Sequence, residues 1–506
     1  MRTRCYHPRV AVTSPAMRTR ALRSALVTGL LASITAFPLA SIARPLAARE
    51  LRTPSRRSPG ASEPLAFVVH PTRPATALSF DQAYSLINGA IDSWRSLDGR
   101  AVRVRLVLGP AAAARAAGIW LLAGHVPPNV TIERTEQQAA DAVADDPSTI
   151  AIVTGDTLSP AVRAATVAGV DPVRDPVSYP LRVPAATPPV RVTTAIAFGD
   201  IMTSRTVDKK IRASGDFLSP FRDVGGELAG ANLAFGNFEG TISHDAHPQP
   251  GGTRFVSRPG VVAGFRYAGI DFLSLANNHA GDYGAGTLLE TVKYLRDGGI
   301  AVAGAGADLA GATAPAVVTR NGIRFAFVSF NAITGTPPAG PAKTGAVRID
   351  MAPWFPFSAA SLAVVEDEVR RARAMADVVI VYPHWGLEYH SHPNPDQIRV
   401  AHALIDAGAD MLIATHPHWV QGAEIYKGHL IAYSLGNFVF DQTWSTETQE
   451  GAALSLTFWG SKLVAASFVP VRIADAHRPR FVDYRDGADI LARIWSASGS
   501  PYRAAA

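Results

Sequence analysis

The chain has 506 residues, of which 47% are hydrophobic and 18% charged, a composition that is ordinary for a globular protein with a large core. Its formal net charge is +6, but residues 1–60 contain eleven arginines and one acid, so they carry +10 and the remainder carries −4. Because the basic charge is confined to the first 60 residues, we expect no nucleic-acid partner. The single cysteine, Cys5, lies there too, which excludes disulfide and cysteine-based chemistry in a chain that has lost this segment.

The first 43 residues have the order of a secretory signal peptide. Arginines up to Arg23 precede an apolar run at 25–40, and the small residues Ser41-Ile42-Ala43 follow. The run is short and is interrupted by Pro38, which argues against a membrane-spanning helix. We therefore expect cleavage after residue 43 and an exported protein, extracytoplasmic or associated with the cell envelope. An uncleaved membrane anchor is the alternative.

Two segments rich in proline divide the rest of the chain. Residues 44–64 are rich in Pro, Arg and Ser and lack apolar periodicity, which predicts a disordered linker. Residues 182–192 predict a hinge. We therefore expect a small α/β domain at 65–185 and a larger domain at 193–482, followed by a helical or frayed tail at 485–506.

The first domain is predicted to alternate strands with helices. Its strands are expected at 65–69, 102–108 and 149–153, and its helices at 80–88 and 111–122. The stretches SFDQAYSLINGAIDSWRSLDG and AIVTGDTLSPAVRAATVAGVDPV resemble parts of a periplasmic solute-binding domain. No ligand-contacting motif is identifiable, so an accessory α/β domain without a ligand is the other interpretation.

The second domain alternates strands and helices and then changes to hairpins, which predicts an α/β sandwich rather than a simple doubly wound sheet. A hairpin is expected across Asn321-Gly322, a strong turn signal, and another across Lys427-Gly428-His429. The remaining predicted strands are 194–198, 233–235, 270–275, 378–382, 411–414, 452–459 and 462–469, and the predicted helices are 287–296, 359–376 and 396–407.

Polar side chains follow the strands of this domain again and again. In open α/β sheets, ligands bind outside the carboxyl ends of the strands. Taken singly, each residue has a structural interpretation, such as Asp200 as a turn former or His384 as a core histidine. Carboxylate, amide and imidazole side chains recur at five strand ends, which favours a common site. Such a mixed set of oxygen and nitrogen donors suits Zn, Mn or Fe better than calcium. The residues at these ends are Asp200, Asn237, Glu239, Asn278, His279, His384, His416 and His418.

Five motifs in this region resemble the CapA family of capsule-synthesis and poly-γ-glutamate biosynthesis proteins. They are GDIMTSR, GNFEGTIS, SLANNHAGDYG, HWGLEY and THPHWVQGAEIYKGHLIAYSLGNFVFD, and they span roughly residues 193–445. That family is similar to the calcineurin-like metallophosphoesterases, so the resemblance implies a four-layer αββα metallophosphatase-like sandwich preceded here by the smaller α/β domain. It also implies one or two divalent metals and the ligands Asp200, Glu239, Asn278, His384, His416 and His418.

The resemblance places His279 as the acid that protonates a leaving group and makes Asp200 part of the catalytic centre. Two metals would clamp the attacking and leaving oxygens of a phosphoryl transfer. Arg205 is a candidate for a bidentate contact with phosphate, although a solvated surface arginine is an equal alternative. Glu388 and Tyr389 are expected to shape the substrate pocket.

One departure separates this chain from the wider phosphoesterase pattern, which begins with D-x-H, because no histidine lies near Asp200 on its strand. The preferred hypothesis is an exported metal-dependent hydrolase acting on a phosphoester or an acidic polymer, with membrane-associated capsule-synthesis machinery as a partner. The alternative is a non-catalytic binding or export factor that uses the metal to hold an acidic polymer. A solute-binding protein with a CapA-like scaffold is a third hypothesis.

Overall fold

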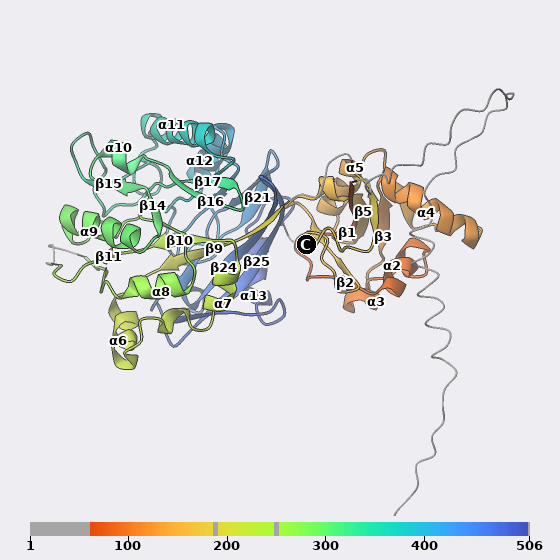
Figure 1. The fold of residues 1–506 in the computed structure, drawn as a ribbon, viewed down its shortest axis with the longest axis horizontal. Coiled ribbons are helices and arrows are strands. Elements are labelled where there is room, and N and C mark those ends of the chain that lie inside the picture. Colours follow the sequence, from red (N-terminus) through yellow and green to blue (C-terminus); the bar gives the residue numbers. More distant parts are fainter. Residues whose placement is uncertain (1–60, 186–190, 247–251, 504–506) are drawn as a thin grey trace, which may run out of the picture.

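The structure, a computed structural model, describes residues 61–185, 191–246 and 252–503 (Figure 1). The predicted signal peptide and most of the predicted linker lie outside these residues. Within the described ranges, no helix is long and apolar enough to cross a membrane.

The first domain is built on one mixed sheet in the order β4-β3-β5-β1-β6, with β8 also paired to β1. Apolar clusters cover both faces of this sheet. Strand β1 begins at Ser62, so the last residues of the predicted linker lie in a strand instead. Its elements are β1 (Ser62–Val69), β2 (Ala77–Leu78), α2 (Phe80–Ile87), α3 (Arg95–Asp98), β3 (Arg105–Leu108), α4 (Pro110–Ala123), β4 (Val130–Ile132), α5 (Glu136–Asp145), β5 (Thr149–Thr154), β6 (Arg163–Ala164), β7 (Thr166–Val167) and β8 (Arg182–Pro184).

The larger domain is built on two large sheets, and the first of them has the order β14-β13-β10-β9-β24-β25-β26, with β23 paired to β9. Strands β9, β10, β13 and β14 are parallel, and β24 to β26 are antiparallel. The elements are β9 (Val192–Ile201), α6 (Arg205–Ser214), α7 (Gly225–Gly230), β10 (Leu233–Phe238), β11 (Thr241–Ile242), β12 (Val256–Ser257), α8 (Val261–Tyr267), β13 (Phe272–Ser274), α9 (Gly284–Asp297), β14 (Ala301–Ala303), β23 (Asn437–Val439), β24 (Glu450–Trp459), β25 (Lys462–Ala474) and β26 (Arg478–Phe481).

The second sheet of this domain has the order β16-β17-β19-β20-β22-β21. Strands β17, β19, β20 and β22 are parallel, and a hairpin closes each edge of the sheet. The elements are β15 (Ala305–Gly306), α10 (Leu309–Ala312), β16 (Ala316–Arg320), β17 (Ile323–Val328), β18 (Gly345–Ala346), α11 (Ala359–Met375), β19 (Val378–Val381), α12 (Pro395–Asp406), β20 (Met411–Ile413), β21 (Ala423–Tyr426), β22 (His429–Ala432) and α13 (Ala488–Ser496).

The two sheets of the larger domain face each other across an aromatic and aliphatic core. Phe327 of β17 stacks on Phe272 of β13 with the ring centroids 3.9 Å apart, and it meets Phe235 of β10 at 5.0 Å. Because side chains alternate along a strand, Ala326 and Val328 point to the other face, where α11 and α12 cover the sheet. Helices α6 to α9 similarly cover the outer face of the first sheet (Figure 1). The domain is therefore a mixed α/β fold of two packed sheets with helices outside.

Both predicted hairpins form, and one differs in detail. Asn321 and Gly322 both have positive φ, as a two-residue turn requires, and they join β16 to β17. The other turn is Lys427-Gly428 alone, because His429 already pairs with Tyr426 as the first residue of β22. The C-terminal segment contains α13, which buries its apolar side in the core between the sheets.

Candidate metal centre

The carboxyl ends of the parallel strands meet at one edge of the two-sheet core. Asp200 of β9 pairs in register with Asn237 of β10 on one side and with Asn437 of β23 on the other. Gly199 has no room for a side chain there, because a Cβ would overlap the carbonyl oxygen of Gly436. This close approach brings the loops after the neighbouring strands around the Asp200 carboxylate.

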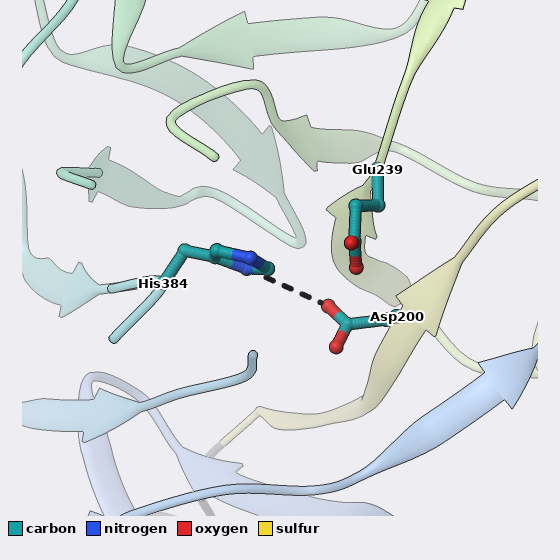
Figure 2. A group of neighbouring side chains, drawn as sticks. All are labelled: Asp200, Glu239 and His384. Carbon is teal, nitrogen blue, oxygen red and sulfur yellow. Dashed lines mark ion pairs between the residues drawn. The ribbon is translucent and has the colours of Figure 1, made fainter. Parts of the chain in front are cut away.

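Three acidic and imidazole side chains lie together at this edge (Figure 2). Ligand atoms of Asp200, Glu239 and His384 all lie within 4.8 Å of one another, and all three residues are buried. His384 Nδ1 lies 3.7 Å from Asp200 Oδ1. Asn237 donates a hydrogen bond of 2.8 Å to the same carboxylate oxygen. Glu239 differs from Asp200, because both of its carboxylate oxygens are buried with no hydrogen-bond partner.

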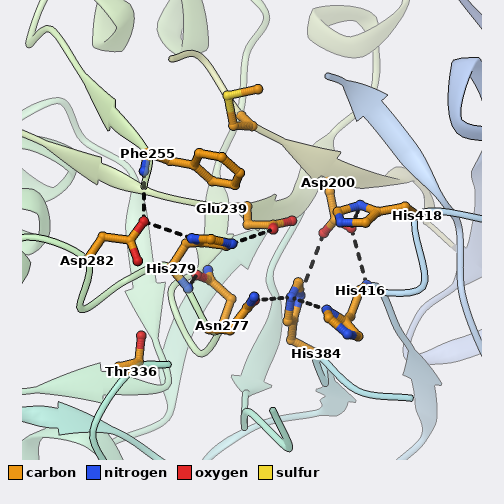
Figure 3. A network of polar contacts seen from close by, with 12 residues as sticks. Asp200, Glu239, Phe255, Asn277, His279, Asp282, Thr336, His384, His416 and His418 are labelled. Atoms are coloured by element: carbon orange, nitrogen blue, oxygen red, sulfur yellow. Dashed lines mark hydrogen bonds and ion pairs between the residues drawn. The ribbon is translucent and has the colours of Figure 1, made fainter. Parts of the chain in front are cut away.

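The two histidines of the His-Pro-His turn lie beside this group (Figure 3). His416 Nδ1 lies 3.1 Å from His384 Nε2, and the backbone N–H of His416 donates to Asp200 Oδ2 at 3.2 Å. His418 Nδ1 lies 3.9 Å from Asp200 Oδ2 and 2.9 Å from Asn437 Oδ1. The ring centroids of His416 and His418 are 6.0 Å apart, so the turn directs both imidazoles to the same cluster.

Asn278 also reaches the cluster, with its Oδ1 2.8 Å from His384 Nε2. The six residues implied as ligands by the family resemblance are thus brought together by the fold. Of these, the Nε2 atom of His416 is buried with no hydrogen-bond partner.

Burial shifts the pKa values of this group in opposite directions. It raises the pKa of Asp200 to about 7, and it raises that of Glu239 well above its usual value, with the Asp200 charge adding to the effect. Burial also lowers the pKa of His418 to about 3 and the pKa values of His384 and His416 well below the usual value. Neutral imidazoles carry the lone pair that a metal needs.

His279 lies on the Glu239 side of the cluster (Figure 3). Its Nε2 is 3.8 Å from Glu239 Oε1, and its Nδ1 is 2.7 Å from Asp282 Oδ2. The ring stacks on Phe255 with the centroids 3.9 Å apart, and the Phe255 backbone N–H also donates to Asp282. Asp282 and Phe255 therefore hold the imidazole with Nε2 towards the carboxylates.

The predicted substrate-contacting residues surround the cluster. Arg205 forms an ion pair with Asp441, with its guanidinium 4.6 Å from the centroid of the Phe255 ring, so it is not simply a solvated surface arginine. The Tyr389 ring stacks at 6.1 Å on His418. Glu388 is half-buried, and burial raises the pKa of its carboxyl, an effect that His279 opposes.

Strained backbone is concentrated at this edge of the sheets. In the described ranges nine non-glycine residues have positive φ, and four of them belong to the predicted site: Arg205, Tyr389, His416 and His418. Such conformations persist only where the surrounding structure enforces them, and they cluster at functional sites.

Several residues of this network were not predicted to have a role of their own. Asn277 donates to Asn237 Oδ1 at 3.1 Å and accepts from the His279 N–H at 3.1 Å. Asp282 and Asp441 fix His279 and Arg205, respectively. Asp282 lies within SLANNHAGDYG, three residues after His279, so its spacing was visible in the sequence. Asp441 is 236 positions from Arg205, and no local pattern could have joined them.

The donor set fits a divalent cation. Two carboxylates, an amide oxygen and three neutral imidazoles make a mixed oxygen and nitrogen shell, which suits Zn, Mn or Fe. The two oxygens of Glu239 and the His416 Nε2 atom are buried and unpartnered, although buried polar atoms normally find partners. A metal ion would supply the missing partner for all three atoms.

Comparison with known proteins places this chain in a family. Its structure is that of an α/β protein with a buried Asp, Glu and His cluster at the carboxyl ends of its strands. The model of the family described as bacterial capsule synthesis protein PGA_cap matches residues 194–442. The chain belongs to this family, as the motifs predicted.

Two curated relatives support the assignment. The capsule biosynthesis protein CapA of Bacillus anthracis is 31% identical over 287 residues, which cover 55% of this chain and 66% of that protein. The PGA biosynthesis protein CapA of Bacillus subtilis (strain 168) is 32% identical over 277 residues, covering 53% and 70%. The chain thus spans about two thirds of the length of these relatives.

One solved structure that resembles part of this chain does so weakly. An ABC-type phosphate transport receptor from Vibrio cholerae is 21% identical and covers 24% of this chain and 54% of that chain, with a TM-score of 0.22. A TM-score this low does not define a fold.

Proposed function

We propose that this protein is an exported, metal-dependent hydrolase of the phosphoesterase type that acts in the handling of a capsule or poly-γ-glutamate. Its two packed sheets with outer helices form, in this proposal, the four-layer αββα metallophosphatase sandwich. The substrate is a phosphoester or an amide of an acidic polymer, and membrane-associated synthesis machinery is the expected partner.

The unpartnered carboxylate of Glu239 carries the proposal. Removing a carboxylate from water without hydrogen bonds is strongly unfavourable, and the negative charge of Asp200 makes the position of Glu239 worse. A fold that needed this side chain only for packing would be more stable with an apolar residue of the same size. A divalent cation between Glu239, Asp200 and His384 reverses the balance.

The metal would be held by Asp200, Glu239, Asn278, His384, His416 and His418. When bound, a divalent ion lowers the pKa of a water molecule and neutralises charge on a reacting oxygen. The surrounding amides prepare the site: Asn237 orients the Asp200 carboxylate, and Asn437 orients the His418 ring. Such partners fix the direction of each donor before the metal arrives.

His279 is placed to move a proton. Its Nδ1 faces Asp282, which accepts the Nδ1 proton and fixes the orientation of the ring, so that Nε2 faces the carboxylate cluster. In the imidazolium form of His279, Nε2 carries a second proton, which a leaving oxygen bound there would receive, leaving a neutral imidazole with its proton on Nδ1. Arg205, held by Asp441 beside the Phe255 ring on which His279 stacks, provides a fixed positive charge for an anionic substrate.

A non-catalytic binding factor is the second candidate, and one observation favours it. The residue two positions after Asp200, where the wider phosphoesterase pattern has histidine, is the fully buried Met202. Its sulfur accepts hydrogen bonds from the N–H and hydroxyl of Ser204. In this alternative the metal holds an acidic polymer, and no bond is broken.

Turnover of an activated phosphoester distinguishes the two candidates. The parent protein loaded with Zn, Mn or Fe is expected to turn over, and His279→Ala should reduce the rate by about a hundredfold to ten-thousandfold while leaving metal content unchanged. His390→Ala, which changes an exposed histidine of a nearby loop, is the matched control and should keep full activity. Absence of turnover with every metal would favour the binding factor.

The proposal of export has its own test. N-terminal sequencing of the protein recovered from the cell envelope or the medium should find a mature terminus near Arg44. Full-length soluble protein confined to the cytoplasm would contradict export.

A further inference from the structure

A cavity of about 410 Å³ lies between the two domains. Its lining includes Arg163, Thr166 and Arg174 from the first domain, and Ser455, Ser467 and Tyr484 from the second. None of the residues of the metal cluster lines it. Strands β24 and β25 form its wall on the side of the larger domain, where they approach the first domain (Figure 1).

The two domains are fixed around this cavity by direct hydrogen bonds. The Tyr484 hydroxyl donates a hydrogen bond of 2.7 Å to the carbonyl oxygen of Thr72. The indole N–H of Trp459 donates one of 2.8 Å to the carbonyl oxygen of Val173. Trp459 and Val464 also pack in the apolar cluster of the first domain. The cavity therefore lies at a packed interface between the domains.

Arg163 brings an uncompensated positive charge to this cavity. Its Nε atom is buried with no hydrogen-bond partner, and no ion pair of Arg163 occurs among the residues that the structure describes. Burial lowers the pKa of its guanidinium, and the only groups that oppose this shift are the hydroxyls of Tyr484 and Tyr502. Arg163 as a whole is half-buried, and a buried polar atom such as its Nε normally has a hydrogen-bond partner, so the missing partner indicates a ligand.

A second arginine lies at the same cavity. Arg174 is exposed, and it donates across the domain boundary to Ser455 Oγ at 3.3 Å. The one acid in the lining is Asp171, whose carboxylate already accepts the Val173 N–H at 2.8 Å. The lining thus has a net positive charge and several hydroxyl groups, with no second acid to satisfy both guanidinium groups.

We propose that this cavity binds a small ligand with an oxyanion, a phosphate or a carboxylate group, held by Arg163 and Arg174. Guanidinium groups recognise both oxyanions through paired N–H donors, and the hydroxyls of Thr166, Ser455 and Ser467 supply further donors. The volume is within the range of small-molecule sites. Because both domains line the cavity, the ligand would bridge them. The site is separate from the metal cluster, and its function does not depend on hydrolysis there.

Isothermal titration calorimetry on the full chain tests this site. The probes are inorganic phosphate and γ-glutamylglutamate, which carries carboxylates but no phosphate. Each is titrated into the parent and into the His416→Ala, His418→Ala variant, so that binding at the metal cluster is recognised by its loss in the variant. We expect saturable binding of at least one probe that persists in the variant, and the preferred probe identifies the oxyanion.

Substitution of the arginines completes the test. Arg163→Gln and Arg174→Gln should each weaken binding by about tenfold to a hundredfold. The control Arg370→Gln, which removes an arginine that is 55% exposed on α11, should leave binding unchanged. No saturable binding to the parent, or equal affinity in all three variants, would overturn the proposal.

The melting temperature without ligand gives a second measurement. If Arg163 binds a ligand, Arg163→Gln removes a charge whose Nε atom is buried and unpaired. The melting temperature without ligand should then stay the same or rise. The increase in melting temperature that the ligand causes in the parent should disappear. A lower melting temperature with an unchanged response to ligand would show a structural role and contradict the proposal. If Arg163→Gln does not fold, the exposed Arg174→Gln decides the question.

Discussion

One glutamate from each domain shows two opposite states of a carboxylate: Glu136 is half-buried with hydrogen-bond partners, and Glu239 is buried without them. In the first domain, Glu136 at the start of α5 accepts the backbone N–H groups of Ala111 at 2.8 Å and Thr154 at 3.1 Å, so both carboxylate oxygens are partnered. In the second domain, Glu239 lies at a strand end with no hydrogen bond to either oxygen. The first carboxylate joins α5 to the start of α4 and to the end of β5, and the second is available to a ligand.

The surroundings of the two carboxylates show the same difference. Glu239 has Asp200 and His384 within reach, and in the ranges that the structure describes this is the one group of three acidic or imidazole side chains close enough to hold a metal. No such group surrounds Glu136. A carboxylate that is buried without a hydrogen-bond partner and lies next to other donor atoms therefore marks the candidate site.

The largest expected effect is the loss of metal from the second domain. The His416→Ala, His418→Ala double variant removes two imidazole donors and should lose most of its bound divalent metal while remaining folded. Inductively coupled plasma mass spectrometry on chelator-free preparations measures the content. The His390→Ala, His392→Ala pair, two histidines also one residue apart on a nearby loop, is the matched control, and equal metal content in the two double variants would contradict the assignment.

Removal of the metal should weaken one domain and leave the other unchanged. Ligand binding to the folded state stabilises it by about 2.7 kcal/mol when the free ligand is a hundredfold above its dissociation constant. Chelator should therefore increase hydrogen exchange in β9, β10, β19 and β20, and not in β1, β3 and β5. Equal acceleration in both sets of strands would mean that the metal stabilises the molecule as a whole rather than the cluster.

Substituting the two glutamates tests the comparison itself. Glu136→Gln leaves a backbone N–H without its acceptor and should lower the free energy of unfolding by about 1–3 kcal/mol. Glu239→Gln replaces a buried carboxyl group that has no hydrogen-bond partner to lose, so in chelator it should leave that free energy unchanged or increase it, and it should weaken metal binding. Urea unfolding in chelator measures both variants, and a larger loss for Glu239→Gln would show that its carboxylate is structural.

The smallest expected effect concerns pH and the first domain. Burial of His70, together with the charge of Arg73, lowers the pKa of its imidazole to about 4, although Asp146 acts in the other direction. His70 is protonated less readily in the folded state than in the unfolded state. Its contribution to the free energy of unfolding is therefore complete above about pH 6.5 and is lost as the pH falls towards 4. His70→Asn should remove this part of the pH dependence. Parallel unfolding curves against pH for parent and variant would contradict this role.

The fold was largely predictable from local patterns. The capping box of Ser79 and Gln82 marks the start of α2, and Asn321-Gly322 marks the β16–β17 turn, because these signals depend on neighbouring residues. Short strands without a strong apolar run, such as β4 and β26, were not predicted. Strand β1 begins at Ser62 because its first residues pair with β8, more than 100 positions away, which no local pattern reports.

The candidate metal ligands could be predicted from the sequence, but the residues that hold the surrounding side chains in place could not. Asp200, His384 and His416 each follow an apolar strand, so strand order and the family motifs were enough to bring them together. The ion pair of Arg205 with Asp441 and the hydrogen bond of His418 with Asn437 depend on how distant loops pack. The interdomain cavity around Arg163 is also a product of packing alone, since its lining comes from both domains.

Metal analysis of the parent protein tests the central claim most directly. The full chain is purified without chelator, dialysed against metal-free buffer and analysed for Zn, Mn and Fe. The unpartnered Glu239 and His416 atoms predict that about one or two equivalents of divalent metal per chain remain bound. A folded protein that retains no metal, and takes up none when Zn, Mn or Fe is added back, would contradict the account.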